Sequence, residues 1–275
     1  MFSKIISAFL ICFFLASCGD NSSTPDYDSS LPVNNIPPPA QIMYKVVAVY
    51  PHDSGAFTQG LEYYGGKLYE GTGEYNRSSL RLVDLKTGKV EKSYLIPDKS
   101  IFGEGITIFK NKIYQLTWQN QKVYVYPLDF NRPVDTLKWN RQGWGATNDG
   151  RNIIISDGSS KLFFVEPDEK NKNFRINKIL TVADNRGEVD SLNELELING
   201  SVFANRWLTN EIVKIDTSTG YVTGTMNLSG LLRQYDPTAR FEDGAVLNGI
   251  AYDTATKKLY ITGKDWPRLF EMQLQ

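Results

Sequence analysis

The chain has 275 residues, with 30 basic and 31 acidic side chains and a formal net charge of -1. This balance provides no basic footprint for nucleic acid and no acidic surface for a general cationic partner, so a nucleic-acid partner is not expected. Both cysteines, Cys12 and Cys18, lie near the N-terminus. A mature chain that begins at or after Cys18 therefore has no internal disulfide.

Residues 1–18 have the features of a lipoprotein signal peptide. Lys4 provides the positive start, residues 5–15 are almost wholly apolar, and Leu15-Ala16-Ser17-Cys18 resembles a bacterial lipobox. The apolar run is too short for a stable membrane span. We expect export, cleavage before Cys18 and lipid anchoring of that cysteine to a cell-envelope membrane, with the domain in the periplasm or at the cell surface. An ordinary cleaved signal is the alternative.

Residues 19–41 are predicted to form a flexible linker. They are rich in serine, threonine and proline, including Pro37-Pro38-Pro39, and have too few bulky apolar residues to build a core. The remaining residues, 42–275, are enough for one large domain. The domain is expected to act as a monomer.

A strand-opening pattern of polar and small residues followed by apolar alternation recurs five times in this domain. Its key positions are 45, 42, 47 and 55 residues apart, at Gln59, Glu104, Ala146, Asn193 and Asn248. Such spacing is typical of propeller blades. At Glu104 the carboxylate lies between Gly103 and Gly105, where we expect a tight turn and close approach of a ligand.

The domain is predicted to be all-β, because its segments alternate with period two and no long stretch has helical periodicity. Each repeat contains strands joined by Gly, Asn or Asp turns, but the last repeat ends one strand short at Gln275. The spare strand at residues 44–50 is expected to complete it. The predicted fold is a five-bladed β-propeller whose last blade is closed by the N-terminal strand; a β-sandwich with coincidental spacing is the alternative.

The residues that open the innermost strands of a propeller converge on its central channel. A ring of Gln59, Glu104, Asn193, Glu194 and Asn248 would suit a hard cation, so a structural Ca²⁺ ion is one expectation and a water-filled channel the other. Four tryptophans lie near openings or strand ends, namely Trp118, Trp144, Trp207 and Trp266. We expect an aromatic-walled pocket with Glu104 at its base. His52 is the only histidine, which excludes a His-rich zinc site and argues against a Ser-His-Asp hydrolase.

An ordered set of motifs resembles the plant-type (papaya-type) glutaminyl-peptide cyclotransferases, which also occur in bacteria. The set spans nearly the whole domain: Phe57-Thr58-Gln59-Gly60-Leu61, Phe102-Gly103-Glu104-Gly105-Ile106-Thr107, Leu116-Thr117-Trp118, Gly143-Trp144-Gly145, Ser156-Asp157-Gly158-Ser159, Leu192-Asn193-Glu194-Leu195-Glu196, Ala204-Asn205 with Trp207, Leu247-Asn248-Gly249-Ile250-Ala251-Tyr252, and Thr262-Gly263-Lys264 with Trp266. The family has a five-bladed propeller fold. One departure is Arg206, where the family pattern has an apolar residue.

The resemblance implies conversion of an N-terminal glutamine of a peptide or protein into pyroglutamate with release of ammonia, and no cofactor for catalysis. It makes Glu104 the general acid/base. It places in the substrate pocket Phe57, Gln59, Phe102, Trp118, Trp144, Asn193, Trp207 and Lys264, and adds Glu62 as a contact for the substrate amine or a channel ligand. Two other functions stay open: a non-catalytic peptide-binding propeller lipoprotein, and a metal-dependent, lactonase-like hydrolase.

Overall fold

The computed structural model describes residues 35–239 and 244–275. The predicted signal peptide and the linker residues up to 34 lie outside the described residues. Within the described ranges the regular secondary structure is β-strand apart from one short helix, α1 (Leu231–Tyr235). No helix of these ranges is long and apolar enough to cross a membrane.

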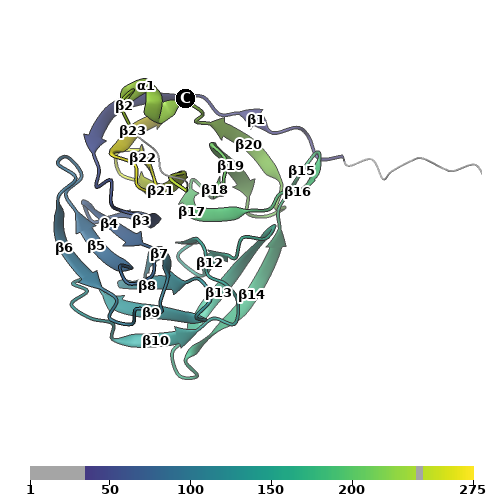
Figure 1. Cartoon of the computed structure of the whole chain (residues 1–275). Helices are drawn as coiled ribbons and strands as arrows, with labels where there is room; N and C mark the ends of the chain where they lie inside the picture. The colour runs from purple at the N-terminus through teal and green to yellow at the C-terminus, as the bar shows by residue number, and fades with distance from the viewer. Residues whose placement is uncertain (1–34, 240–243) are drawn as a thin grey trace, which may run out of the picture. The chain divides into compact units, whose positions relative to one another are not determined.

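The strands form sheets that stand around a common centre (Figure 1). The first sheet has the order β3 (Thr58–Tyr64), β4 (Lys67–Thr72), β5 (Ser79–Val83), β6 (Val90–Leu95). An eight-stranded sheet has the order β11 (Ala146–Asn148), β12 (Ile153–Ser156), β13 (Lys161–Asp168), β14 (Asn173–Thr181), β10 (Asp135–Lys138), β9 (Lys122–Pro127), β8 (Lys112–Thr117), β7 (Gly103–Phe109).

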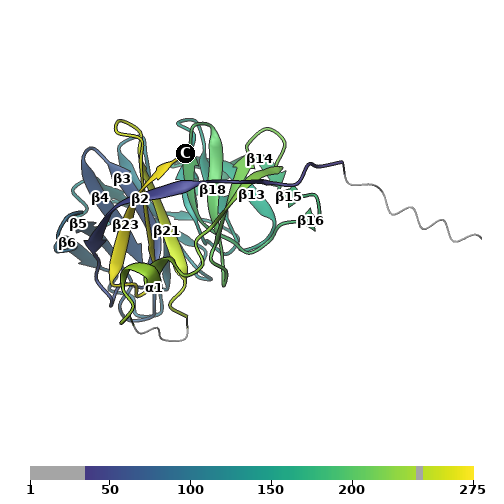
Figure 2. The same ribbon diagram turned by 90° about the horizontal axis from the view of Figure 1, so that it is seen from above.

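The other sheets follow in the second half of the chain. One has the order β1 (Ala40–Gln41), β20 (Val222–Asn227), β19 (Glu211–Asp216), β18 (Ser201–Arg206), β17 (Leu192–Ile198). Another has the order β2 (Tyr44–Pro51), β23 (Arg268–Leu274), β22 (Lys258–Gly263), β21 (Leu247–Asp253), and a small hairpin pairs β15 (Ala183–Asp184) with β16 (Gly187–Glu188). Figure 2 shows α1 at one end of strands β21 and β23.

The predicted pairing of residues 44–50 with the C-terminal strands is confirmed. β2 runs antiparallel to β23, with Tyr44 opposite Leu274 and Pro51 opposite Arg268. This pairing covers the edge of β23 that would otherwise be exposed. Ala40 and Gln41, at the end of the predicted linker, pair in parallel with Gly224 and Thr225 of β20. These two residues cover the edge of the sheet at β20, a pairing that the sequence pattern did not reveal.

The innermost strands form a closed circuit. β3, β7, β11, β17 and β21 each contact the next in that order, and β21 returns to β3. Apolar side chains fill the space between neighbouring sheets; Leu61 and Leu68 of the first sheet, for example, pack on Ala251, Tyr260 and Leu269 of the last. Burial of a side chain of this size contributes about 1.5–3 kcal/mol.

Four of the five strand openings coincide with an irregularity in the sheet, and the opening at Ala146 pairs regularly. The register shifts between Thr58 and Gly60, between Gly103 and Ile106, between Leu192 and Leu195, and between Leu247 and Ile250. Extra residues of this kind, β-bulges, redirect side chains and are common beside active sites. The recurring sequence pattern therefore marks the places where inner strands turn side chains toward the end of the channel.

The glycines of these openings let neighbouring inner strands approach each other. A Cβ on Gly105 would lie 2.6 Å from the Trp144 carbonyl oxygen, and one on Gly145 would lie 1.9 Å from the Asn193 carbonyl oxygen. The Gly105 N–H donates to that Trp144 oxygen at 2.7 Å. The glycine beside Glu104 therefore lets the backbone before β11, the next inner strand, come close.

Candidate active site

A cavity of about 250 Å³ opens at the end of the channel where these irregularities lie. Its lining consists of Phe57, Gln59, Phe102, Glu104, Trp118, Trp144, Asn193, Trp207 and Lys264. The volume is below the range of about 300–1,000 Å³ that is usual for drug-sized ligands, so it suits a single amino-acid residue. All of the predicted pocket residues except Glu62 meet here.

Glu104 is enclosed at this cavity, with only 5% of its surface exposed. Burial raises the pKa of its carboxyl group well above 4.5, and the positive charge of Lys264 opposes this rise. Burial thus favours the protonated carboxyl group, and the Lys264 charge favours the carboxylate.

Lys264 directly follows β22 and is 4% exposed. Its backbone N–H donates to the Val246 carbonyl oxygen at 2.8 Å, and its Nζ lies 4.6 Å from the centre of the Phe57 ring. Burial lowers the pKa of its ammonium group, while the carboxylate of Glu104 counteracts the change. The Phe57 ring provides a cation–π partner that holds this amine at the cavity.

The orientation of the Gln59 carboxamide is determined by Asn248. Asn248 Nδ2 donates to the Thr58 carbonyl oxygen at 2.9 Å and to Gln59 Oε1 at 3.3 Å. Because a carbonyl oxygen can only accept, it is the amide nitrogen of Asn248 that faces Thr58, and Gln59 must offer its oxygen. The NH₂ group of Gln59 is then the part of the carboxamide left to donate at the cavity.

Aromatic rings form the cavity walls. Trp144 and Trp207 pack edge to face with 5.4 Å between ring centres, and Phe102 packs against Phe57 at 6.0 Å and Trp118 at 5.8 Å. Trp207 is 40% exposed, so it lies at the rim. Edge-to-face pairs hold the rings in fixed relative orientations.

One side chain that the sequence reasoning missed secures two of these walls. Gln142 Oε1 accepts the indole N–H of Trp118 at 2.8 Å and that of Trp144 at 2.9 Å. A third indole, Trp139, donates to the Gln142 backbone carbonyl at 3.0 Å. Gln142 stands two residues before Trp144, but no pattern in the sequence indicates its partner Trp118.

Glu62, which was predicted to contact the substrate amine or a channel ligand, does not line the cavity. It lies three residues beyond Gln59 on β3, roughly 10 Å further along the strand at about 3.3 Å per residue. There its carboxylate accepts the Ile108 N–H at 3.4 Å and a hydrogen bond from Thr107. Removal from water raises the pKa of Glu62 to about 7.

Glu62 lies near Glu194 and Glu196, because its charge raises the pKa of both. Glu194 accepts the backbone N–H groups of Leu61 and Ile250 at 3.2 and 2.8 Å, and Glu196 accepts that of Tyr252 at 3.1 Å. These carboxylates therefore connect inner strands to one another. Within residues 35–239 and 244–275 no group of three or more His, Cys, Asp or Glu side chains is placed to hold a metal ion, so the predicted channel Ca²⁺ gains no support.

Two other residues lie outside the cavity. Trp266, which the sequence pattern grouped with the pocket tryptophans, is buried in the core, where its ring packs against Phe270 at 6.2 Å and covers Gly263. Arg206, the departure from the family pattern, pairs with Glu211 at 3.2 Å and Asp190 at 3.8 Å. Its charge is therefore held beside the rim and not in the cavity.

Comparison with known proteins points to one family. Residues 13–274 match the family model described as glutamine cyclotransferase. The chain is 36% identical to the glutaminyl-peptide cyclotransferase of Arabidopsis thaliana over 274 residues, which cover 98% of this chain and 81% of that protein. It is also similar to the crystal structure of Myxococcus xanthus glutaminyl cyclase, with a TM-score of 0.79, 31% identity and coverage of 86% of this chain and 98% of the other.

Proposed function

The chain belongs to the glutamine cyclotransferase family, and we propose that it converts the N-terminal glutamine of peptides or proteins into pyroglutamate by general acid/base catalysis at Glu104. The observation that supports this mechanism is a residue-sized aromatic cavity that contains one buried carboxyl group. The glutaminyl residue would occupy that cavity, and the rest of the bound peptide would extend past Trp207 at the rim.

The reaction forms one bond and breaks one. The α-amino nitrogen attacks the side-chain carbonyl carbon, the bond from that carbon to the amide nitrogen breaks, and the nitrogen leaves as ammonia. The attacking amine must lose a proton and the leaving nitrogen must gain one. Glu104, the carboxyl group that lines the cavity, is placed to take the first proton and to deliver the second.

Closure of a five-membered ring is intramolecular, so the main task of the cavity is to hold the folded conformer of the glutaminyl residue. The rings of Trp118, Trp144 and Trp207 provide walls for that conformer. Their contacts form with substrate and transition state alike, so they are expected to affect KM more than kcat.

The carbonyl oxygen of the substrate amide gains negative charge as the ring closes. We assign its stabilisation to the NH₂ group of Gln59, which Asn248 orients, together with the ammonium group of Lys264 and the carboxamide of Asn193. Donors that are already oriented before the reaction need no reorganisation as the charge develops.

No bound cofactor is part of this proposal, because the chain itself provides the proton carrier and the donors. The test is to incubate the purified protein with a glutaminyl dipeptide and to measure ammonia, with and without a chelator. Ammonia release that the chelator leaves unchanged is the expected result. Release abolished by chelation would favour the lactonase-like alternative, and peptide binding without ammonia would favour the non-catalytic one.

We propose further that the fold is a five-bladed β-propeller. The eight-stranded sheet then counts as two blades, β7 to β10 and β11 to β14, which are joined at their outer strands by the single parallel pair Lys138 and Asn173. The closed circuit of inner strands supports this division. β2 supplies the outer strand of the last blade.

For the cellular location we propose a monomer anchored through lipid on Cys18, with its catalytic domain outside the cytoplasm. This rests on the lipobox-like Leu15-Ala16-Ser17-Cys18. Stable anchoring requires more than one acyl chain, which a lipidated N-terminal cysteine provides. Intact-mass analysis of the native protein tests it: an unlipidated terminus downstream of Cys18 would contradict the anchor.

A further inference from the structure

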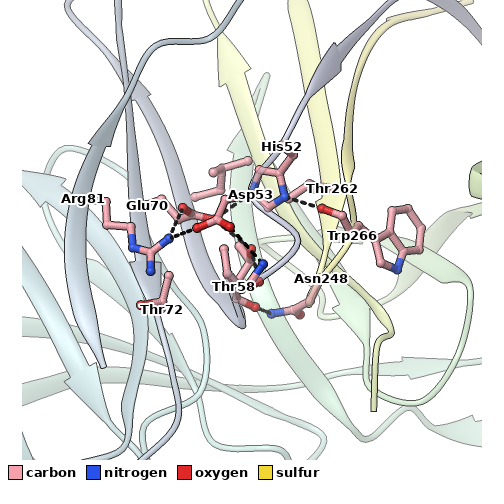
Figure 3. A network of polar contacts seen from close by, with 12 residues as sticks. His52, Asp53, Thr58, Glu70, Thr72, Arg81, Asn248, Thr262 and Trp266 are labelled. Atoms are coloured by element: carbon pink, nitrogen blue, oxygen red, sulfur yellow. Dashed lines mark hydrogen bonds and ion pairs between the residues drawn. The ribbon is translucent and has the colours of Figure 1, made fainter. Parts of the chain in front are cut away.

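A buried network of charged side chains lies next to the cavity and has no part in the mechanism above (Figure 3). Its centre is His52, the only histidine of the chain, which follows β2 and is 8% exposed. His52 Nδ1 lies 2.7 Å from the Trp266 carbonyl oxygen, and Nε2 lies 2.9 Å from Glu70 Oε1. Both ring nitrogens therefore face oxygen acceptors.

This geometry, beside an ionised Glu70, favours the imidazolium form. A neutral imidazole has one N–H and could donate to only one of the two oxygens, whereas the imidazolium ion donates to both. Burial would lower the pKa of His52, but the Glu70 carboxylate and the Trp266 carbonyl outweigh burial and raise it. Burial likewise opposes ionisation of Glu70, but His52 and Arg81 lower the pKa of its carboxyl group.

The other charged groups around His52 reinforce this state. Arg81 Nη1 lies 3.9 Å from Glu70 Oε2 and 2.8 Å from Asp53 Oδ2. Asp53, next to His52 in the chain, also raises the pKa of the histidine. The groups that face the ring are therefore Glu70 from β4, Asp53 from its own loop and the Trp266 carbonyl, with Arg81 of β5 behind the carboxylates.

The network contacts two of the segments that carry polar cavity residues, those of Gln59 and Lys264. On one side, His52 contacts Trp266, which lies two residues after Lys264. In the same turn, the Asp265 N–H donates to the Ala56 carbonyl oxygen at 2.8 Å. On the other side, Thr58 donates its hydroxyl to Glu70 Oε1 at 2.8 Å. Thr58 lies between Phe57 and Gln59, which both line the cavity.

We propose that His52, as an imidazolium ion, is a positioning residue that fixes the turn after Lys264 against the strand of Phe57 and Gln59, and so sets where Lys264 and Gln59 meet the substrate amide. The proposal rests on the proposed function for its kinetic readout. It gives the enzyme an alkaline limit. When His52 loses its proton, one of its two hydrogen bonds is lost and the two segments are no longer held together.

Because His52 is the only histidine, its protonation can be measured directly. In the protein labelled with ¹⁵N-histidine and free of any histidine tag, NMR should show both ring nitrogens protonated at neutral pH and a titration midpoint above 6.5, the ordinary histidine value. A neutral ring with one protonated nitrogen at pH 7 would overturn the proposal.

The kinetic test uses Glu70→Gln, which removes the charge that holds the proton on His52 and keeps the size of the side chain. The titration midpoint of His52 should fall. The alkaline limb of the pH profile of kcat for ammonia release should move to lower pH by the same number of pH units. At a pH above the new midpoint kcat should fall about tenfold, the value of one hydrogen bond to a charged group, and it should recover at a pH where His52 is again protonated.

Glu271→Gln is the matched control. Glu271 is a carboxylate with 3% exposure that accepts from Tyr50 at 2.7 Å and pairs with Lys258 at 2.8 Å, away from the cavity lining. This variant should lower the melting temperature without moving the kcat profile. If Glu70→Gln lowered the titration midpoint of His52 but left the pH profile of kcat unchanged, the positioning role would be overturned. Absence of ammonia release from the wild-type protein at every pH, despite the expected NMR result, would instead refute the proposed function.

Discussion

The Gln142 side chain allows a quantitative test of how the cavity walls contribute to activity. Gln142→Ala removes the one oxygen that accepts from the indoles of Trp118 and Trp144 at 2.8 and 2.9 Å. A neutral hydrogen bond contributes about 0.5–1.5 kcal/mol net, so two contribute about 1–3 kcal/mol. Gln142 is exposed and water can replace it, so the lower end applies. About 1 kcal/mol corresponds to roughly fivefold in kcat/KM.

This loss should appear mainly as a higher KM for a glutaminyl dipeptide, measured by ammonia release, because the walls bind substrate and transition state alike. Gln142→Glu is the control, since a carboxylate oxygen can accept both indole N–H groups and should preserve KM better than alanine. A KM for Gln142→Ala within twofold of wild type would refute the reasoning, as would equal losses in the two variants.

Three further predictions follow from burial and packing. Gly145→Ala, whose Cβ would lie 1.9 Å from the Asn193 oxygen, should destabilise the protein by at least about 2 kcal/mol in denaturant unfolding, whereas Gly55→Ala, whose nearest contact is 3.4 Å, should be nearly neutral. Burial raises the pKa of Glu104, so the folded state loses stability as the pH rises above the pKa that this carboxyl group has in the unfolded chain. Glu104→Gln should therefore be more stable than wild type at neutral pH, with no difference in stability below about pH 4. Equal stability at pH 7 would contradict that. Deletion through Pro51 removes β2 and should unfold the domain, whereas deletion through residue 34 should leave its melting temperature unchanged.

The sequence predicted the inner strands well because their pattern has a local physical cause. The openings at Gln59, Glu104, Asn193 and Asn248 carry bulges, and the glycines beside them permit close strand contacts. The need for a bulge and for small residues recurs with successive inner strands, so the sequence pattern repeats at regular spacing. The closing strand was predictable for a similar reason, because the last repeat lacked a partner for β23.

The parts that escaped prediction depend on partners distant in the sequence. Trp266 and Trp118 both follow the second strand of a repeat, but Trp266 fills the core beside Phe270 and Trp118 faces the cavity. His52 lies in a loop as expected, yet it is buried because Glu70 and Trp266 surround it. The pairing of Ala40 and Gln41 with β20 likewise has no local signal. Such contacts become visible only when the sheets are placed side by side.

The most direct test of the central proposal is the turnover of Glu104→Gln. Glutamine keeps the size of the side chain but cannot carry the proton, so kcat for ammonia release should fall about 10²-fold to 10⁴-fold with little change in KM. Trp207→Ala should show the opposite division, a higher KM with a smaller loss in kcat. Undiminished ammonia release from Gln-peptides by Glu104→Gln would contradict the account and move the catalytic role to another carboxylate.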